Sequence, residues 1–168
     1  WINGDVSKVT FDNVSFIDNT SRSGNGGAVY VNSTSQTIGV TNVHVLNSTF
    51  YNNTAKNGGA IYATGYGTNA YILDSTIAGN RVTGDGGGIY ITTNNSSTST
   101  NVDILNSIVF ANYKNATSND IYINRGTLDM AYSVYGYTNE DPTSRSIDAM
   151  QYDATQNNVQ RVFNTITN

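Results

Sequence analysis

Apolar and polar positions alternate with a period of two in four segments of the chain, and these segments superpose without gaps. Such alternation is typical of β-strands with one buried face. Three residues after the last apolar position of each segment stands an asparagine, and seven to nine residues further on comes a triplet that ends in an aliphatic residue and Tyr. The segments begin at Val9, Val43, Ala70 and Val102, and a weaker fifth copy begins at Leu128.

The repeat length decides the kind of fold. Successive triplet tyrosines are 32, 28 and 32 residues apart, and a period near 30 indicates either a solenoid or a propeller. Each repeat has two or three short strands, too few for a four-stranded propeller blade, and no helical periodicity. The sequence therefore predicts an all-β fold, a single-stranded parallel β-helix of about four and a half rungs over residues 1–135. Equivalent strands would pair in register about 4.8 Å apart.

Stacking of equivalent positions explains the polar residues of the repeat. The asparagines after each segment would form a buried ladder whose side-chain amides bond to the rungs above and below. This structural ladder consists of Asn19, Asn53, Asn80 and Asn112. A second ladder is expected at Asn13, Asn47, Asp74 and Asn106. Double glycines before the first three triplets indicate a sharp turn or a close approach of two backbones.

Two pairs of short motifs carry a resemblance to a known family. FIDN at 16–19 is followed by GGAV at 26–29, and FYNN at 50–53 is followed by GGAI at 58–61. These pairs resemble the FxxN and GGA[ILV] repeats of chlamydial polymorphic outer-membrane proteins, and similar repeats occur in adhesin-like surface proteins of bacteria and methanogenic archaea. The resemblance covers residues 9 to about 135. It implies a right-handed β-helix that is displayed outside the cell for adhesion or envelope structure. Ile77 and Val109 depart from the pattern where it has Phe, and no double glycine precedes Asp120.

Composition and charge narrow the possible functions. The formal net charge of −4 argues against a cationic nucleic-acid binder, and no apolar run is long enough to span a membrane as a helix. With no Cys and one His, we expect neither a metal site nor another cofactor. The chain opens at Trp1 without Met or a signal region, so we interpret it as a mature product or an excised piece.

Catalysis by a β-helix that degrades polysaccharides requires clustered carboxylates. Asp103 and Asp129 fall in the same outward column of adjacent rungs, and His44 and Tyr71 precede them in that column. The alternative is that these are unrelated solvent-facing side chains on a polar sheet. No acidic triad assembles from the other aspartates, so we expect no catalytic site and no enzymatic activity.

The tyrosines of the triplets are the more informative surface feature. Because the flanking aliphatic residues face inward, alternation places Tyr30, Tyr62, Tyr90 and Tyr122 outward in one column. The column is a candidate site for sugars or for a protein partner, since exposed tyrosines are common anchors. It is alternatively a self-supporting stack. Leu46, Leu73 and Leu105 form another outward column, which either meets a partner or is covered by the C-terminal segment.

Residues 136–168 differ from the repeats. They contain the only Pro and the only Glu, with Ile147, Met150 and Ala154 at helix-like spacing. We expect a C-terminal cap or docking segment, because the end of a β-helix exposes unpaired strand edges.

The sequence thus predicts a non-catalytic, adhesin-like or structural module that is extracellular or on the cell surface. Its expected partners are a protein or glycan on a host or neighbouring cell, or other copies of itself, with no nucleic acid and no membrane insertion. One alternative is a filament subunit that stacks head to tail. Another is a polysaccharide lyase or hydrolase domain centred on Asp103 and Asp129.

Overall fold

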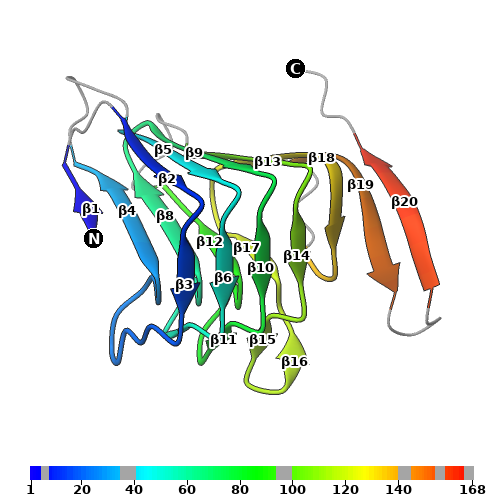
Figure 1. Cartoon of the computed structure of the whole chain (residues 1–168), viewed down its shortest axis with the longest axis horizontal. Helices are drawn as coiled ribbons and strands as arrows, with labels where there is room; N and C mark the ends of the chain where they lie inside the picture. Colours follow the sequence, from blue (N-terminus) through cyan, green and yellow to red (C-terminus); the bar gives the residue numbers. More distant parts are fainter. Residues whose placement is uncertain (5–7, 35–40, 94–99, 140–144, 154–157, 165–168) are drawn as a thin grey trace.

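The computed structural model describes residues 1–4, 8–34, 41–93, 100–139, 145–153 and 158–164, and for the last two ranges it describes the backbone alone. Within these ranges there is no helix, and the strands pair in parallel except for β15 with β16 and β19 with β20. Successive rungs stack along the horizontal axis of Figure 1, with the N-terminus at the left. The prediction of an all-β parallel β-helix is confirmed.

Each rung runs through four walls, which we number in chain order. Wall 1, at the top in Figure 1, consists of β2 (Val9–Asp12), β5 (Thr41–Leu46), β9 (Thr68–Leu73), β13 (Asn101–Leu105) and the first half of β18 (Thr127–Tyr135). Wall 2 consists of β3 (Ser15–Ile17), β6 (Thr49–Tyr51), β10 (Thr76–Ala78), β14 (Ile108–Phe110) and the end of β18. Wall 3 consists of β7 (Thr54–Ala55), β11 (Arg81–Val82) and β15 (Tyr113–Lys114), with β16 (Thr117–Ser118) at its edge. Wall 4 consists of β1 (Ile2–Asn3), β4 (Val29–Ser33), β8 (Ile61–Gly65), β12 (Ile89–Ile91) and β17 (Ile121–Ile123).

Walls 1 and 2 belong to one sheet that bends sharply. At the bend each rung has a residue with positive φ, between 49° and 57°, and four of the five are Asn or Asp, which tolerate this conformation best among residues with side chains. The five are Asn13, Asn47, Asp74, Asn106 and Tyr132. The same bend therefore recurs in every rung.

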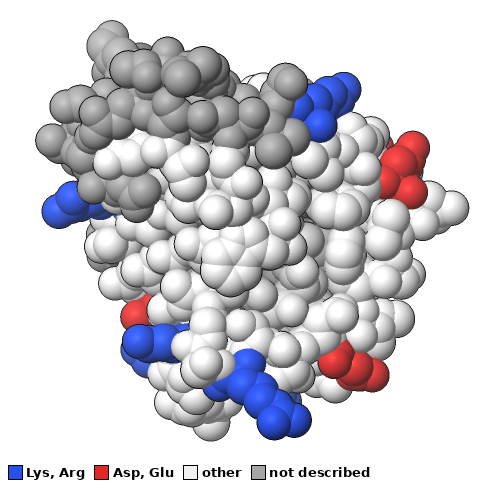
Figure 2. All heavy atoms as spheres, turned by 90° about the vertical axis from the view of Figure 1, so that its left-hand side faces the viewer, with Lys and Arg blue, Asp and Glu red and all other residues white. Residues whose placement is uncertain are grey.

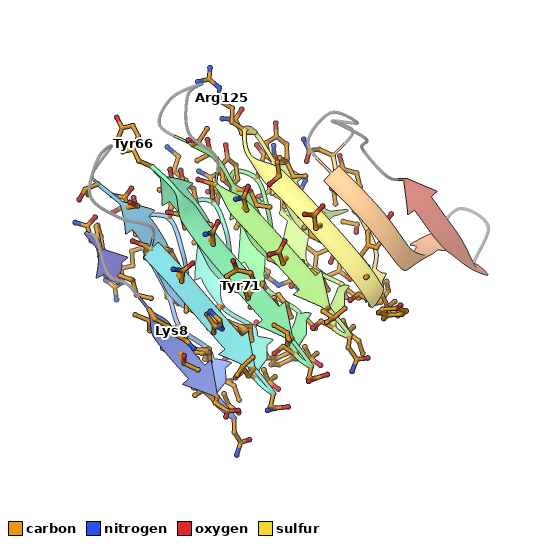
Figure 3. The ribbon with its side chains drawn as sticks, turned by 90° about the horizontal axis from the view of Figure 1, so that it is seen from above. Lys8, Tyr66, Tyr71 and Arg125 are labelled. Carbon is orange, nitrogen blue, oxygen red and sulfur yellow. The ribbon has the colours of Figure 1, made fainter. Side chains whose placement is uncertain are left out.

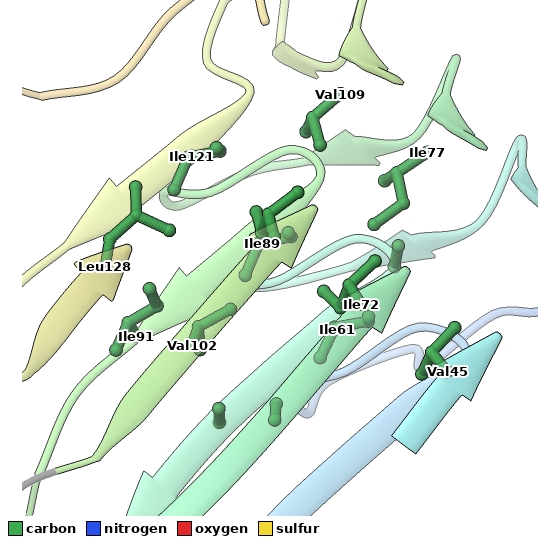
Figure 4. Close-up of a cluster of buried hydrophobic side chains, with 14 of the residues drawn as sticks. Val45, Ile61, Ile72, Ile77, Ile89, Ile91, Val102, Val109, Ile121 and Leu128 are labelled. Atoms are coloured by element: carbon green, nitrogen blue, oxygen red, sulfur yellow. The ribbon is translucent and has the colours of Figure 1, made fainter. Parts of the chain in front are cut away.

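The core lies between the walls, and Figure 4 shows aliphatic side chains of different walls pointing into it. Its inward columns follow the register that the sequence predicts, such as Val43 with Ala70 and Ile61 with Ile89. The core is open at its N-terminal end. Phe11 and Phe16 are partly exposed there, whereas Phe50, the next residue in the column of Phe16, is fully buried.

The described part of the C-terminal segment is made of strands, although its apolar residues have helix-like spacing. Instead of a helix, it forms β19 (Arg145–Asp153), which pairs with β18, and β20 (Asn158–Asn164), which pairs with β19. Ile147 pairs with Met130 and Met150 with Val134, so the spacing of three accompanies a register shift in β18 and not a helical turn. Ala154 lies outside the described residues.

Strand β19 continues the sheet beyond β18 along the axis on which the rungs stack, as Figure 1 shows. The described part of the tail thus continues the sheet that carries the leucine column and does not lie over it. Leu105 is 39% exposed. That residues 136–168 act as a cap or docking segment stays a prediction.

Candidate functional site

The asparagine ladder is confirmed, and it lies where wall 2 turns into wall 3. Asn53 donates from its backbone N and from Nδ2 to Oδ1 of Asn80, at 2.9 and 2.8 Å. Asn80 makes the same pair of bonds to Asn112, and Asn19 makes it to Asn53. Asn53, Asn80 and Asn112 are fully buried. In each of these asparagine pairs the donor belongs to the N-terminal residue and the acceptor to the C-terminal one, so the ladder has a direction.

Asp120 ends the ladder in place of a fifth asparagine. Its Oδ1 accepts from the backbone N and from Nδ2 of Asn112, both at 2.8 Å. Its Oδ2 accepts from Oγ of Ser118 at 3.1 Å and from the backbone N of Tyr137 at 2.8 Å. Asp120 is fully buried, and burial raises its pKa to about 6 although the bonds that it accepts act in the opposite direction. No role for Asp120 in the ladder was predicted from the sequence.

We expect the protein to lose stability as the pH rises from about 4 to about 6. The folded protein holds the proton of Asp120 more tightly than an exposed aspartate with a pKa of 3.8 does. The stabilisation is therefore complete below the lower pKa and is lost as the pH passes the higher one. The difference between the two pKa values corresponds to about 3 kcal/mol. Urea unfolding between pH 4 and pH 7 measures it, and equal stability at both ends of this range would contradict the prediction.

The matched control for this measurement is Asp120→Asn, which cannot titrate. The free energy of unfolding of this variant should depend less on pH than that of the wild type. A smaller decrease with rising pH should remain, because partial burial and Asp129 raise the pKa of Asp103. The variant should also be less stable than the wild type at pH 4, because its amide would face the N–H of Tyr137.

A second buried ladder consists of serines, at the bend between walls 1 and 2. Oγ of Ser75, for example, accepts from the backbone N of Ser48 at 3.1 Å and donates to the carbonyl of Leu73 at 2.7 Å. The members are Ser48, Ser75, Ser107 and Ser133. The signal in the sequence is a serine directly after the bend residue of each rung but the first, and it was not recognised as a ladder.

The second ladder that the sequence predicted, through Asn13, Asn47, Asp74 and Asn106, does not form as a continuous row. These residues are exposed at the bend. Nδ2 of Asn47 donates to Asp12 at 3.0 Å, and Nδ2 of Asn106 donates to Asp74 at 2.5 Å. The positive φ at this position selects Asn and Asp for their backbone conformation, and the neighbouring serines form the ladder.

Tyr30, Tyr62, Tyr90 and Tyr122 lie in register in one column on wall 4. Neighbouring rings are nearly parallel, with centroids 5.1 to 5.3 Å apart. Trp1 extends the column at its N-terminal end, with its ring 4.7 Å from that of Tyr30. Trp1 was not expected in this column, because it precedes the first recognisable repeat segment, which begins at Val9.

The stacking limits how this column can bind a partner. Each inner ring has a neighbour on both faces, so only ring edges and hydroxyls remain for contact with a ligand. Partial burial, with a further contribution from Tyr90 and Tyr30, raises the pKa of Tyr62 to about 12, so its hydroxyl stays a donor at neutral pH. Trp1, which is 85% exposed, offers an open ring face. The geometry suits a self-supporting stack, and binding by the tyrosines stays a prediction.

On the outside of wall 1, one column runs through His44, Tyr71, Asp103 and Asp129 in register. Tyr71, labelled in Figure 3, stands between His44 and the two aspartates, so the acid pair has no histidine beside it. Burial and the neighbouring Asp129 raise the pKa of Asp103. The expectation that this column carries no catalytic site stays a prediction.

Basic side chains gather on and beside wall 3, and Figure 2 shows blue atoms along the lower edge of the N-terminal end. Nζ of Lys114 lies 2.9 Å from Asp85, in the one ion pair found within the described ranges. The guanidinium of Arg81 lies 5.2 Å from the ring centroid of Tyr113. Arg22 and Lys56 both follow the bridged pair Thr20 and Thr54 in adjacent rungs, but the backbone N of Lys56 donates to the carbonyl of Gly24 at 2.8 Å, so the two basic residues are not in register.

The acidic residues and the histidine do not form a larger cluster in the part of the chain that the structure describes. No three His, Cys, Asp or Glu side chains there come close enough together to hold a metal ion. Nor do these described residues include a helix long and apolar enough to cross a membrane.

A ladder asparagine and an outward tyrosine in four successive rungs, with a glycine turn in the first three, define this chain as a repeat-built parallel β-helix. The family model of the Chlamydia polymorphic membrane protein repeat matches residues 13–32, 47–64 and 74–92, about a third of the chain. The chain thus carries this repeat at three places, as the resemblance predicted. The fourth rung, in which Asp120 ends the ladder, is outside the matched ranges. Comparisons with curated proteins and with solved structures found no match.

Proposed function

We propose that the chain is a non-catalytic, adhesin-like module that is displayed outside the cell or on its surface. The observation that carries the proposal is the polymorphic membrane protein repeat, which occurs three times and builds one rung at each occurrence. A repeat that is characteristic of membrane proteins supports a surface location. The module would present a binding face to a protein or glycan of a host or neighbouring cell.

The construction of the rungs suits this role. Two buried ladders tie each rung to the next, so outward side chains repeat at the strand spacing of about 4.8 Å on a stiff support. A partner with a periodic structure, such as an oligosaccharide, could then contact several rungs at once, and weak contacts would add through multivalency.

The test is binding of the purified chain to intact host and bacterial cells and to a panel of neutral and acidic glycans. We expect reproducible binding to at least one surface component, with no change in the covalent structure of the glycan. Absence of binding throughout would contradict the adhesin role, and cleavage of any glycan would contradict the non-catalytic one. Tyr62→Phe combined with Tyr90→Phe keeps the stack and removes two hydroxyls. Unchanged binding by this variant would exclude the hydroxyl row from the site.

Head-to-tail stacking into a filament is the less favoured function, because the two ends of the asparagine ladder do not complement one another. Oδ1 of Asn19 at the N-terminal end accepts no hydrogen bond from a described residue. Asp120 at the other end carries no side-chain N–H that could donate to it. Asp120 is moreover fully buried, and its oxygens already accept four hydrogen bonds, so it cannot pair with Asn19 of a second copy.

A further inference from the structure

Two hollows adjoin at the N-terminal end of the molecule. One, of about 400 Å³, lies beside wall 3 and is lined by Arg22, Lys56 and five serine and threonine side chains. The other, of about 450 Å³, is lined by Trp1, Tyr30 and the glycine turn at 24–28. Thr20 and Ser21 line both hollows, so the two are direct neighbours.

The first hollow concentrates positive charge without a carboxylate partner. Arg22 and Lys56 both line this hollow, so their like charges repel each other across it. Neither forms an ion pair within the described ranges. Asp85 is paired with Lys114, and Asp18 accepts a hydrogen bond from Asn52 at 2.6 Å. An anion between Arg22 and Lys56 would relieve the repulsion, and the surrounding hydroxyls could donate to it.

The second hollow supplies an apolar platform. The tyrosines of the column share their ring faces, whereas Trp1 is stacked only on Tyr30 and is 85% exposed. Aromatic side chains with a few polar groups are typical of the lining of ligand sites, and both volumes fall in the range of such sites. The net charge of the chain is −4, whereas the adjoining hollow carries the two positive charges of Arg22 and Lys56.

We propose that the two hollows form one site for a sugar that carries an anionic substituent, a carboxylate or a sulfate. The anion lies between Arg22 and Lys56, and the adjoining sugar ring packs on Trp1. The inference rests on the proposed adhesin function and specifies its site and its class of ligand.

The experiment measures binding of the whole chain to three short oligosaccharides by calorimetry: a carboxylated one from polygalacturonate, a sulfated one from heparin, and a neutral one. We expect the anionic probes to bind and the neutral one to bind at least about tenfold more weakly, with affinity falling as salt rises. Comparison of the carboxylated and sulfated probes shows which substituent the site prefers. Equal binding of the neutral probe would overturn the proposal.

Arg22→Gln combined with Lys56→Gln should weaken binding of the anionic probes by about tenfold or more. The matched control is Lys8→Gln combined with Arg125→Gln, which removes the same charge from two of the positions labelled in Figure 3, next to the wall 1 strands β2 and β18. Trp1→Ala should weaken binding of the oligosaccharides but not of inorganic sulfate. Equal losses in the two charge variants would overturn this site and leave the adhesin function standing, whereas failure of all cell and glycan binding would remove both.

Discussion

Replacing Asn80 with alanine is expected to lower the free energy of unfolding by about 3 to 5 kcal/mol. Oδ1 of Asn80 is the acceptor for two donors of Asn53, and Nδ2 of Asn80 donates to the carbonyl of Phe50 at 3.1 Å. All these groups lie in a buried part of the ladder. Alanine would leave several of them without a partner, and each unpaired buried group costs about 1 to 3 kcal/mol. Denaturant unfolding followed by circular dichroism measures the change.

Asn69→Ala is the matched control for this prediction, because Asn69 also belongs to a row of asparagines but lies on the outside of wall 1. Its amide donates to Asn42 at 3.1 Å and it accepts from Asn101 at 2.9 Å, at a partly exposed position that water can reach. We expect a loss of less than about 1 kcal/mol. Similar losses in the two variants would show that burial of the ladder does not determine its contribution.

Gly59→Ala is expected to have the largest effect of any single substitution proposed here, with a loss above about 4 kcal/mol or failure to fold. A Cβ at position 59 would lie 2.1 Å from the carbonyl oxygen of Gly87 and 3.1 Å from the backbone N of Arg81. The backbone N of Gly59 donates to the carbonyl of Gly86 at 3.0 Å, so the rungs cannot separate without breaking this bond. The contact is with backbone atoms, and no side-chain rotation relieves it.

Gly24→Ala provides the comparison for the glycine turn. Its added Cβ would meet only Oγ of Ser21 at 2.9 Å, the end of a side chain that can rotate. We expect a melting temperature within a few degrees of the wild type, which corresponds to a change of about 1 kcal/mol or less. Thermal unfolding of both variants tests the argument, and a Gly59→Ala protein with an unchanged melting temperature would refute it.

The rungs and their register were predictable because the repeats superpose without gaps in the strands. Val43, Ala70 and Val102 share a column in the sequence and in the structure, and so do the ladder asparagines. The tail was not predictable in the same way. Strand β19 pairs with the edge of β18, and the sequence of the tail alone does not show this pairing. The register shift between Ala131 and Val134 accounts for the helix-like spacing of Ile147 and Met150.

The candidate site was only partly predictable, since its residues come from segments of different kinds. The tyrosine column lies on regular strands, so alternation was sufficient to find it. Arg22 and Lys56 lie in the turn between ladder and triplet, whose length varies from rung to rung. Both line one hollow, although the turn of the first rung is longer by two residues, so the repeat pattern of the sequence does not bring them together. Asp120 is the first residue of its triplet and not a residue of the ladder position. The antiparallel pair of β15 and β16 turns the chain back, so that Asp120 reaches Asn112.

The direction of the asparagine ladder also bears on how the number of repeats can change. A repeat inserted between the rungs of Asn53 and Asn80 would find an acceptor on one side and donors on the other, so both of its neighbours would remain satisfied. A repeat placed after Asp120 would meet a carboxylate whose oxygens already accept four hydrogen bonds. Duplication within the array can therefore lengthen the module while its closed end stays unchanged.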